Sequence, residues 1–113
     1  MASSSVSRYQ RSLLTQLKLG FLPLKIETDR YQGISAENRL CKTCTLNIPE
    51  DEIHFLFSCP ALQHVRDSLC NQTIWSIGDD LLKFRKMFFK ENIEYSAVLV
   101  ERLYKERQRV IYH

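Results

Sequence analysis

The chain has 113 residues, of which 44% are hydrophobic and 26% charged, and its formal net charge is +3. This composition is typical of one small globular domain and excludes an intrinsically disordered chain. No apolar run is long enough to span a bilayer, so we expect no contact with a membrane. A net charge of +3 is too small to identify a nucleic-acid-binding protein by charge alone.

The charges are unevenly distributed along the chain. Residues 1–43 contain seven Lys and Arg against three acidic residues, and residues 71–113 contain eight against six. Residues 44–70 contain one Arg against four acidic residues. Basic flanks around an acidic centre are suited to contact with a polyanion, although solvated helix faces explain the same pattern equally well.

The pattern predicts a single domain after a short disordered N-terminus. Residues 1–7 are rich in serine and are expected to fray. Residues 8–113 show mainly helical periodicity, so we expect a small, mostly α-helical domain. Its first part, residues 8–40, should contain an N-terminal helix that ends at Gly20. A short extended segment should follow, because apolar residues alternate over positions 22–26.

The second part of the domain, residues 41–60, contains four residues with the spacing of metal ligands. Cys41 and Cys44 form a C-x2-C pair, nine residues follow, and His54 and Cys59 form an H-x4-C pair. A C-x2-C turn presents two sulfurs to one ion without strain, and three thiolates with one imidazole complete a tetrahedron. The sequence therefore predicts one structural zinc ion. A full set of four protein ligands argues against a catalytic ion, so we expect no enzyme.

A helix is expected to carry His54 into this site. Pro49 suits the first turn of a helix, and the three acidic residues at positions 50–52 favour the positive end of its dipole. We expect Glu50 or Asp51 to hold the second ring nitrogen of His54. Basic residues beside the first pair of cysteines should offset the negative charge of an ion bound by three thiolates.

The third part of the domain, residues 61–113, is expected to be helical except for a linker over residues 71–78. Three helices are predicted, over residues 61–70, 81–90 and 93–111, with Asp79 or Asp80 as the cap of the second. The expected core side chains of these helices are Leu62, Val65, Leu69, Leu81, Leu82, Phe84, Phe88, Phe89, Ala97, Val98, Val100, Leu103 and Tyr104. The side chains expected to project from the last turns are Arg102, Lys105, Arg107 and Arg109.

Other interpretations of the cysteines remain open at this point. Cys41 and Cys44 can form a redox-active dithiol, but no βαβ pattern surrounds them. Disulfides require an oxidising compartment, and no signal peptide is recognisable, so we expect an intracellular chain, nuclear or cytoplasmic. Four unligated, buried cysteines are a further alternative. The fourth ligand is also open, since His64 can replace His54 and Cys70 is a more distant alternative.

The residues around the ligands resemble those of a known family. The run Arg39-Leu40-Cys41-x2-Cys44, followed by Glu50-Asp51-Glu52-x-His54-Phe55-Leu56-x2-Cys59-Pro60 and Arg66, resembles the cysteine-rich region after the reverse transcriptase domain of non-LTR (LINE-type) retrotransposons. The preceding segment, Ile26-Glu27-Thr28-x-Arg30-Tyr31-x-Gly33-Ile34, is similar to the segment before the first cysteine in many retrotransposons of this family from animals. The resemblance covers residues 8 to about 110. The sequence departs from it at Asp29, where glycine is frequent, and lacks the paired-aspartate polymerase motif and an endonuclease domain.

The resemblance implies a non-catalytic, zinc-binding module that helps to hold an RNA template or a DNA target. Its expected partners are single-stranded RNA or DNA and the rest of a reverse transcriptase, and its metal ligands would be Cys41, Cys44, His54 and Cys59. The expected nucleic-acid contacts are Arg30, Tyr31, Arg39 and Lys42, since cations neutralise phosphates and tyrosine stacks on unpaired bases. Equally, the arginines can balance the thiolates while the tyrosine lies in the core. The alternative function is a zinc-stabilised module for protein–protein interaction or dimerisation.

Overall fold

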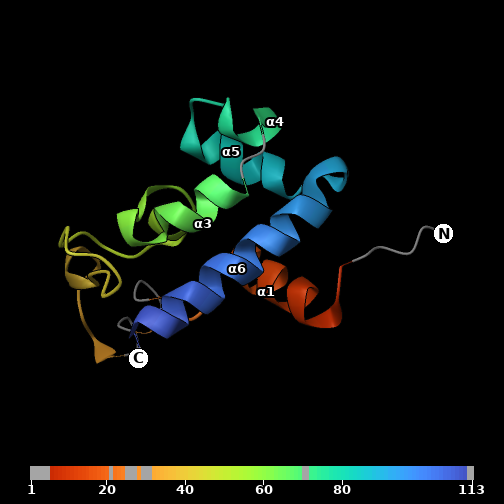
Figure 1. Cartoon of the computed structure of the whole chain (residues 1–113). Helices are drawn as coiled ribbons and strands as arrows, with labels where there is room; N and C mark the ends of the chain where they lie inside the picture. The colour runs from red at the N-terminus through yellow and green to blue at the C-terminus, as the bar shows by residue number, and fades with distance from the viewer. Residues whose placement is uncertain (1–5, 21, 25–27, 29–31, 70–71, 112–113) are drawn as a thin grey trace.

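The computed structural model describes residues 6–20, 22–24, 28, 32–69 and 72–111. Within these ranges the chain is mostly helical, as predicted, and its only strand-like pairing is an isolated antiparallel bridge between Leu40 and Pro49. The longest helix, α6 (Ile93–Ile111), runs through the molecule, and α1 (Arg8–Leu19) and α3 (Gln63–Ser68) pack against it (Figure 1). No helix in the described part of the chain combines the length and apolar character needed to cross a membrane.

Helix α1 has well-defined ends. The Ser7 hydroxyl accepts a hydrogen bond from the backbone N–H of Gln10, and the Gln10 side chain accepts one from the backbone N–H of Ser7, which forms a capping box. Gly20 ends the helix at φ 77°, a left-handed conformation that costs glycine little. The predicted end at Gly20 is therefore confirmed. The side chains that α1 buries are Leu13, Leu14 and Leu17.

The hydrophobic core lies between α1, α6 and the segments that cross them. Leu22 and Leu24 lie outside any helix, yet both are completely buried. Burial of a leucine side chain contributes about 1.5–3 kcal/mol, so these two residues hold the segment after α1 firmly against the core. Residues 22–24 form no strand, and the remainder of the predicted extended segment lies outside the described residues.

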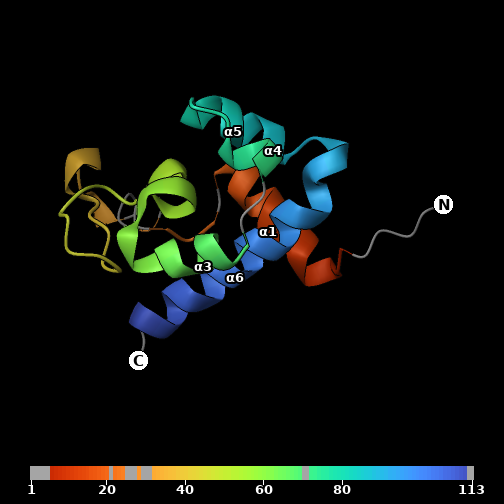
Figure 2. The same ribbon diagram turned by 45° about the horizontal axis from the view of Figure 1, so that its top comes forward.

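The segment predicted as a linker contains a helix. Helix α4 (Gln72–Trp75) packs beside α5 (Asp80–Met87), as Figure 2 shows, and Ile74 is completely buried. The linker prediction is therefore wrong for residues 72–75. A four-residue helix has too little periodicity to be recognised, and this one is stabilised by packing rather than by propensity.

Helix α5 has the predicted cap, but it ends at Met87, before the predicted end at residue 90, and its predicted core is partly wrong. The carboxylate of Asp79 accepts hydrogen bonds from the backbone N–H groups of Leu81 and Leu82, which caps the helix. Met87 is buried and defines the inward face. At about 100° per residue, Leu81 and Leu82 lie more than a quarter turn from Met87, and their exposed fractions are 66% and 43%. Phe89, also predicted as core, is 43% exposed.

Helix α6 has the predicted bounds and follows the 3-10 turn η5 (Lys90–Asn92). The side chain of Asn92 donates to the carbonyl of Lys86 at 2.8 Å, and the Ser96 hydroxyl donates to that of Met87 at 2.7 Å. The carbonyl of Lys86 also accepts from the backbone N–H of Phe89 at 3.1 Å, so side chains and backbone together satisfy the last carbonyls of α5. The predicted inward face is confirmed for the buried residues Ala97, Val100 and Leu103.

Candidate metal centre

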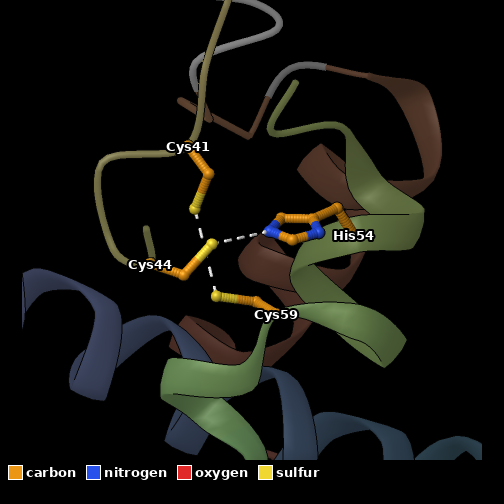
Figure 3. Close-up of side chains that lie close together, drawn as sticks. All are labelled: Cys41, Cys44, His54 and Cys59. Atoms are coloured by element: carbon orange, nitrogen blue, oxygen red, sulfur yellow. Dashed lines mark hydrogen bonds between the residues drawn. The ribbon is translucent and has the colours of Figure 1, made fainter. Parts of the chain in front are cut away.

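Four side chains converge from two short segments of the chain. Cys41 and Cys44 lie in the loop after the 3-10 turn η2 (Ala36–Asn38), while His54 and Cys59 lie at the two ends of the π-helical turn η3 (His54–Ser58). Figure 3 shows the two cysteines of the loop facing the imidazole and the third cysteine. The structure therefore brings together the four predicted ligands.

The distances between these side chains fit one metal ion. The sulfurs of Cys41 and Cys59 are 3.9 Å apart, and the Cys44 sulfur is 3.5 Å from Nε2 of His54. All four ligand atoms lie within 4.8 Å of one another. A tetrahedron with metal–sulfur bonds of about 2.3 Å has edges of about 3.8 Å, which matches the measured separations. Three of the residues are buried and Cys44 is half-buried, so the centre is shielded from water.

The loop that carries Cys41 and Cys44 is closed by backbone hydrogen bonds. The N–H of Cys41 donates to the carbonyl of Ile48 at 2.9 Å, and the N–H of Glu50 donates to that of Arg39 at 2.9 Å. Asn47 makes the reversal in the left-handed region, at φ 56°, where asparagine is one of the few tolerated residues. The loop thus folds back on itself and presents both sulfurs on one side.

A π turn explains how residues five positions apart reach the same ion. In a regular α-helix, His54 and Cys59 would point about 140° apart, because the helix rotates by about 100° per residue. Here the N–H of Cys59 donates to the carbonyl of His54 at 2.8 Å, which is the wider turn of a π-helix. The wider turn brings both side chains to one face. The H-x4-C spacing is the only sequence signal of this feature.

The predicted partner of the second ring nitrogen of His54 is wrong. The Asp51 carboxylate accepts a hydrogen bond from the backbone N–H of His54 at 2.8 Å, and that of Glu50 is paired with Arg107. His54 Nδ1 is buried and has no hydrogen-bond partner among the described residues. The helical turn also begins after Asp51, so Pro49 lies in the bridge with Leu40 and not in the first turn.

A buried arginine, Arg66, donates hydrogen bonds to the π turn that carries two of the ligands. Arg66 is 3% exposed, and its guanidinium donates to the carbonyls of Leu56 at 2.7 Å, Cys59 at 2.7 Å and Phe55 at 3.2 Å. These carbonyls lie at the end of the π turn, and that of Cys59 also accepts from a backbone donor, the N–H of Leu62, at 3.1 Å. Burial lowers the pKa of Arg66, but a guanidinium remains protonated. Arg66 therefore supplies a cation next to a centre in which three thiolates and a divalent ion would carry a net negative charge.

Replacing Arg66 by Ala is expected to lower the free energy of unfolding by about 3 kcal/mol, because the carbonyls of Phe55 and Leu56 lose the guanidinium donor and that of Cys59 keeps only the N–H of Leu62. Chemical denaturation of the metal-loaded protein measures this loss. Arg102→Ala, at an exposed position of α6, is the matched control and should change stability by less than about 0.5 kcal/mol. Arg66→Lys should retain only part of this stability, since an ammonium group cannot bridge all three carbonyls. Equal stability of the two alanine variants would contradict this role.

The sulfurs of Cys41 and Cys59 lie within hydrogen-bonding distance of each other. A hydrogen bond between them lowers the pKa of the Cys41 thiol to about 3 and raises the pKa of the Cys59 thiol above its ordinary value. A bound ion requires both sulfurs as thiolates, so binding must displace the proton of Cys59.

Metal affinity should therefore fall as the pH falls, because protons compete with the ion for Cys59. Titration with a competing chelator at several pH values measures this dependence. Calorimetry in buffers of different ionisation enthalpy should show proton release on binding. An affinity that does not change with pH would contradict the assignment of thiolate ligands.

The remaining predicted site residues differ in position. Lys42 is exposed, as a contact residue must be. Arg39 is half-buried and donates from Nε to the carbonyl of Ile34 at 2.8 Å. Arg30 and Tyr31 lie outside the described residues.

Of the alternative ligands, His64 is not part of the cluster. The side chain of His64 is 62% exposed, and its Nε2 lies 3.2 Å from the carboxylate of Glu106. His64 is therefore a surface residue paired with α6, and His54 is the histidine of the cluster. Cys70 lies outside the described residues.

A buried ion pair, absent from the sequence-based prediction, ties the metal loop to α6. The Arg107 guanidinium donates to the Glu50 carboxylate from Nε at 2.6 Å and from Nη2 at 2.7 Å, and both side chains are almost completely buried. Arg107 was expected to project into solvent, and that prediction is wrong. It follows the buried residues Val100 and Leu103 at i+7 and i+4, which places it on the inward face of the helix. This spacing is the signal that could have identified it.

Comparisons of the chain with protein-family models, with curated proteins and with solved structures find no match. The fold and the site therefore define the class of protein: a small, mostly helical domain in which one Cys3His cluster can hold a metal ion.

Proposed function

We propose that the ion is zinc and that its role is structural. Three thiolates and an imidazole form a soft, tetrahedral donor set, which suits zinc better than the harder cations that prefer oxygen ligands. All four positions of the tetrahedron are taken by side chains, so no position remains for a substrate. The ion would join the loop at residues 41–44 to the turn at residues 54–59. We propose no catalytic activity for this centre.

We further propose that the domain is a non-catalytic module that binds single-stranded RNA or DNA. The observation that carries this proposal is a groove of about 460 Å³ beside the metal loop. Lys42, between the two ligating cysteines, stands at this groove together with the polar side chains Thr28, Gln32 and Gln108. Lysine can neutralise a phosphate, and amide and hydroxyl groups can hydrogen-bond to bases and sugars. The ion would hold the loop, and with it Lys42, in place.

Two of the exposed cations on α6 are already paired with carboxylates of the same helix. Lys105 is paired with Glu101 at 3.0 Å, and Arg109 is paired with Glu106 at 2.6 Å. These cations are already balanced by neighbouring carboxylates, whereas Lys42 has no carboxylate within ion-pair distance in the described part of the chain.

The resemblance to the region after the reverse transcriptase domain of non-LTR retrotransposons supports the same function. In that family the region helps to hold an RNA template or a DNA target. Arg30 and Tyr31 belong to the proposed contact by this resemblance. Arg39 also belongs to it, although its hydrogen bond to Ile34 gives it a structural role as well. The rest of a reverse transcriptase is the proposed protein partner.

The protein is expected to bind a labelled single-stranded RNA or DNA oligonucleotide with micromolar or tighter affinity, weakening steeply with salt. Lys42→Ala should weaken binding several-fold and reduce the slope of log K against log salt by about one, as expected for the loss of one phosphate contact. Fluorescence anisotropy over a salt series measures both quantities. Lys105→Ala is the matched control and should leave both unchanged. Absence of binding, or binding that is independent of salt, would contradict the proposed function.

A further inference from the structure

A second groove lies between α1 and α5, on elements that do not carry the metal ligands. It consists of two adjoining hollows of about 240 and 330 Å³, which share Lys18 and Phe88 in their lining. The other apolar residues of the lining are Leu14, Phe84, Phe89 and Ile93. Phe84 and Phe88 meet edge to face at 5.1 Å between ring centroids, which fixes the orientation of both rings.

Apolar side chains around this groove are exposed beyond what the fold requires. Phe89, which lines the groove, is 43% exposed, and so is Leu82 on α5, which lies outside the lining, seven positions before Phe89 in the sequence. Both were expected in the core, and no described element covers them. Exposed apolar groups gathered at a concave surface are characteristic of an interaction site.

The rim of the groove is basic and its charges are unbalanced. Arg11, Lys18 and Arg85 line it, and no acidic residue does. None of the three is within ion-pair distance of a carboxylate in the described ranges, in contrast to Lys105 and Arg109 of α6. Lys18 instead lies 5.7 Å from the centre of the Phe88 ring. The groove therefore combines an apolar floor with a positive rim.

We propose that this groove binds an acidic segment of a partner protein that carries at least two apolar side chains. The apolar side chains would enter the two hollows, and the neighbouring carboxylates would pair with Lys18 and Arg85. The charge complementarity of the rim selects an acidic partner. The concave shape favours inserted side chains over a flat lipid surface. This inference goes beyond nucleic-acid binding, because it concerns a different face of the domain and a different ligand.

The test uses the zinc-loaded protein and two fluorescein-labelled synthetic peptides. In the first, phenylalanines alternate with glutamates, and in the second lysines replace the glutamates. We expect the acidic peptide to bind and the basic one not to bind. Arg85→Glu and Phe89→Ala should each weaken binding about fivefold or more. Lys18→Glu provides a second charge reversal on α1, should Arg85→Glu perturb α5. Arg102→Glu on α6 is the matched control and should leave the affinity unchanged.

The same variants separate this inference from the proposed nucleic-acid binding. Lys42→Ala should leave peptide binding unchanged, and Arg85→Glu should leave oligonucleotide binding unchanged. Failure of the acidic peptide to bind would overturn the inference. Binding of the protein to vesicles that contain phosphatidylserine, lost in Arg85→Glu, would also overturn it, since the groove would then serve a membrane surface. An equal loss of oligonucleotide binding in Arg85→Glu would assign the groove to nucleic acid instead.

Discussion

His54→Ala is expected to abolish tight metal binding and to unfold the segment from the metal loop to the π turn. A structural zinc ion contributes about 10–16 kcal/mol in small zinc-binding peptides, whereas a whole domain is stable by only about 5–15 kcal/mol. Removal of one of four ligands also leaves three clustered sulfurs without a closed coordination sphere. Metal content by mass spectrometry and thermal unfolding by circular dichroism measure the two effects.

His64→Ala is the matched control for that experiment. It removes an imidazole of the same size from a side chain that is 62% exposed and paired with Glu106. An exposed pair of this kind contributes at most about 1 kcal/mol, so this variant should keep its metal and nearly all of its stability. A His54→Ala protein that binds one ion and unfolds like His64→Ala would show that the ligand set is wrong.

Arg107→Ala is expected to lower the free energy of unfolding by about 3–5 kcal/mol, because it leaves the buried carboxylate of Glu50 without its partner. Arg109→Ala is the matched control on the same helix, since its side chain is 62% exposed and is paired with the half-buried Glu106 one turn away. That substitution should cost about 0–1 kcal/mol. Urea denaturation of both variants measures the difference.

A double substitution tests whether the loss comes from the unpaired charge. Glu50→Leu with Arg107→Met replaces the buried pair by apolar groups, which in other buried pairs is neutral or stabilising. The double variant should therefore be more stable than Arg107→Ala. An Arg107→Ala protein as stable as Arg109→Ala would contradict the assignment of this pair as a structural tie between the metal loop and α6.

The parts of the structure that depend on local spacing could be predicted from the sequence. The C-x2-C and H-x4-C pairs identify the cluster because both are fixed by short stretches of chain. The end of α1 at Gly20 and the cap of α5 at Asp79 follow from residue types that suit these positions. Local chemistry alone decides these features, so no knowledge of tertiary packing was needed.

The parts that depend on long-range contacts could not be predicted. Glu50 and Arg107 are 57 positions apart, and nothing in either neighbourhood indicates that they meet. In the sequence, Arg66 cannot be distinguished from other helical arginines, because only the fold shows the carbonyls to which it donates. Helix α5 was assigned too many core residues, because its apolar residues occupy more of its circumference than the elements packed against it cover.

The most direct test of a zinc-stabilised domain is a native mass spectrum of the purified protein, followed by a spectrum of the same sample after denaturation. The native spectrum should show one zinc ion for each chain, and denaturation should release it. Cys59→Ser should lose the ion in the native spectrum as well. A native protein without metal, with its thiols oxidised in pairs, would contradict the structural role assigned to Cys41, Cys44, His54 and Cys59.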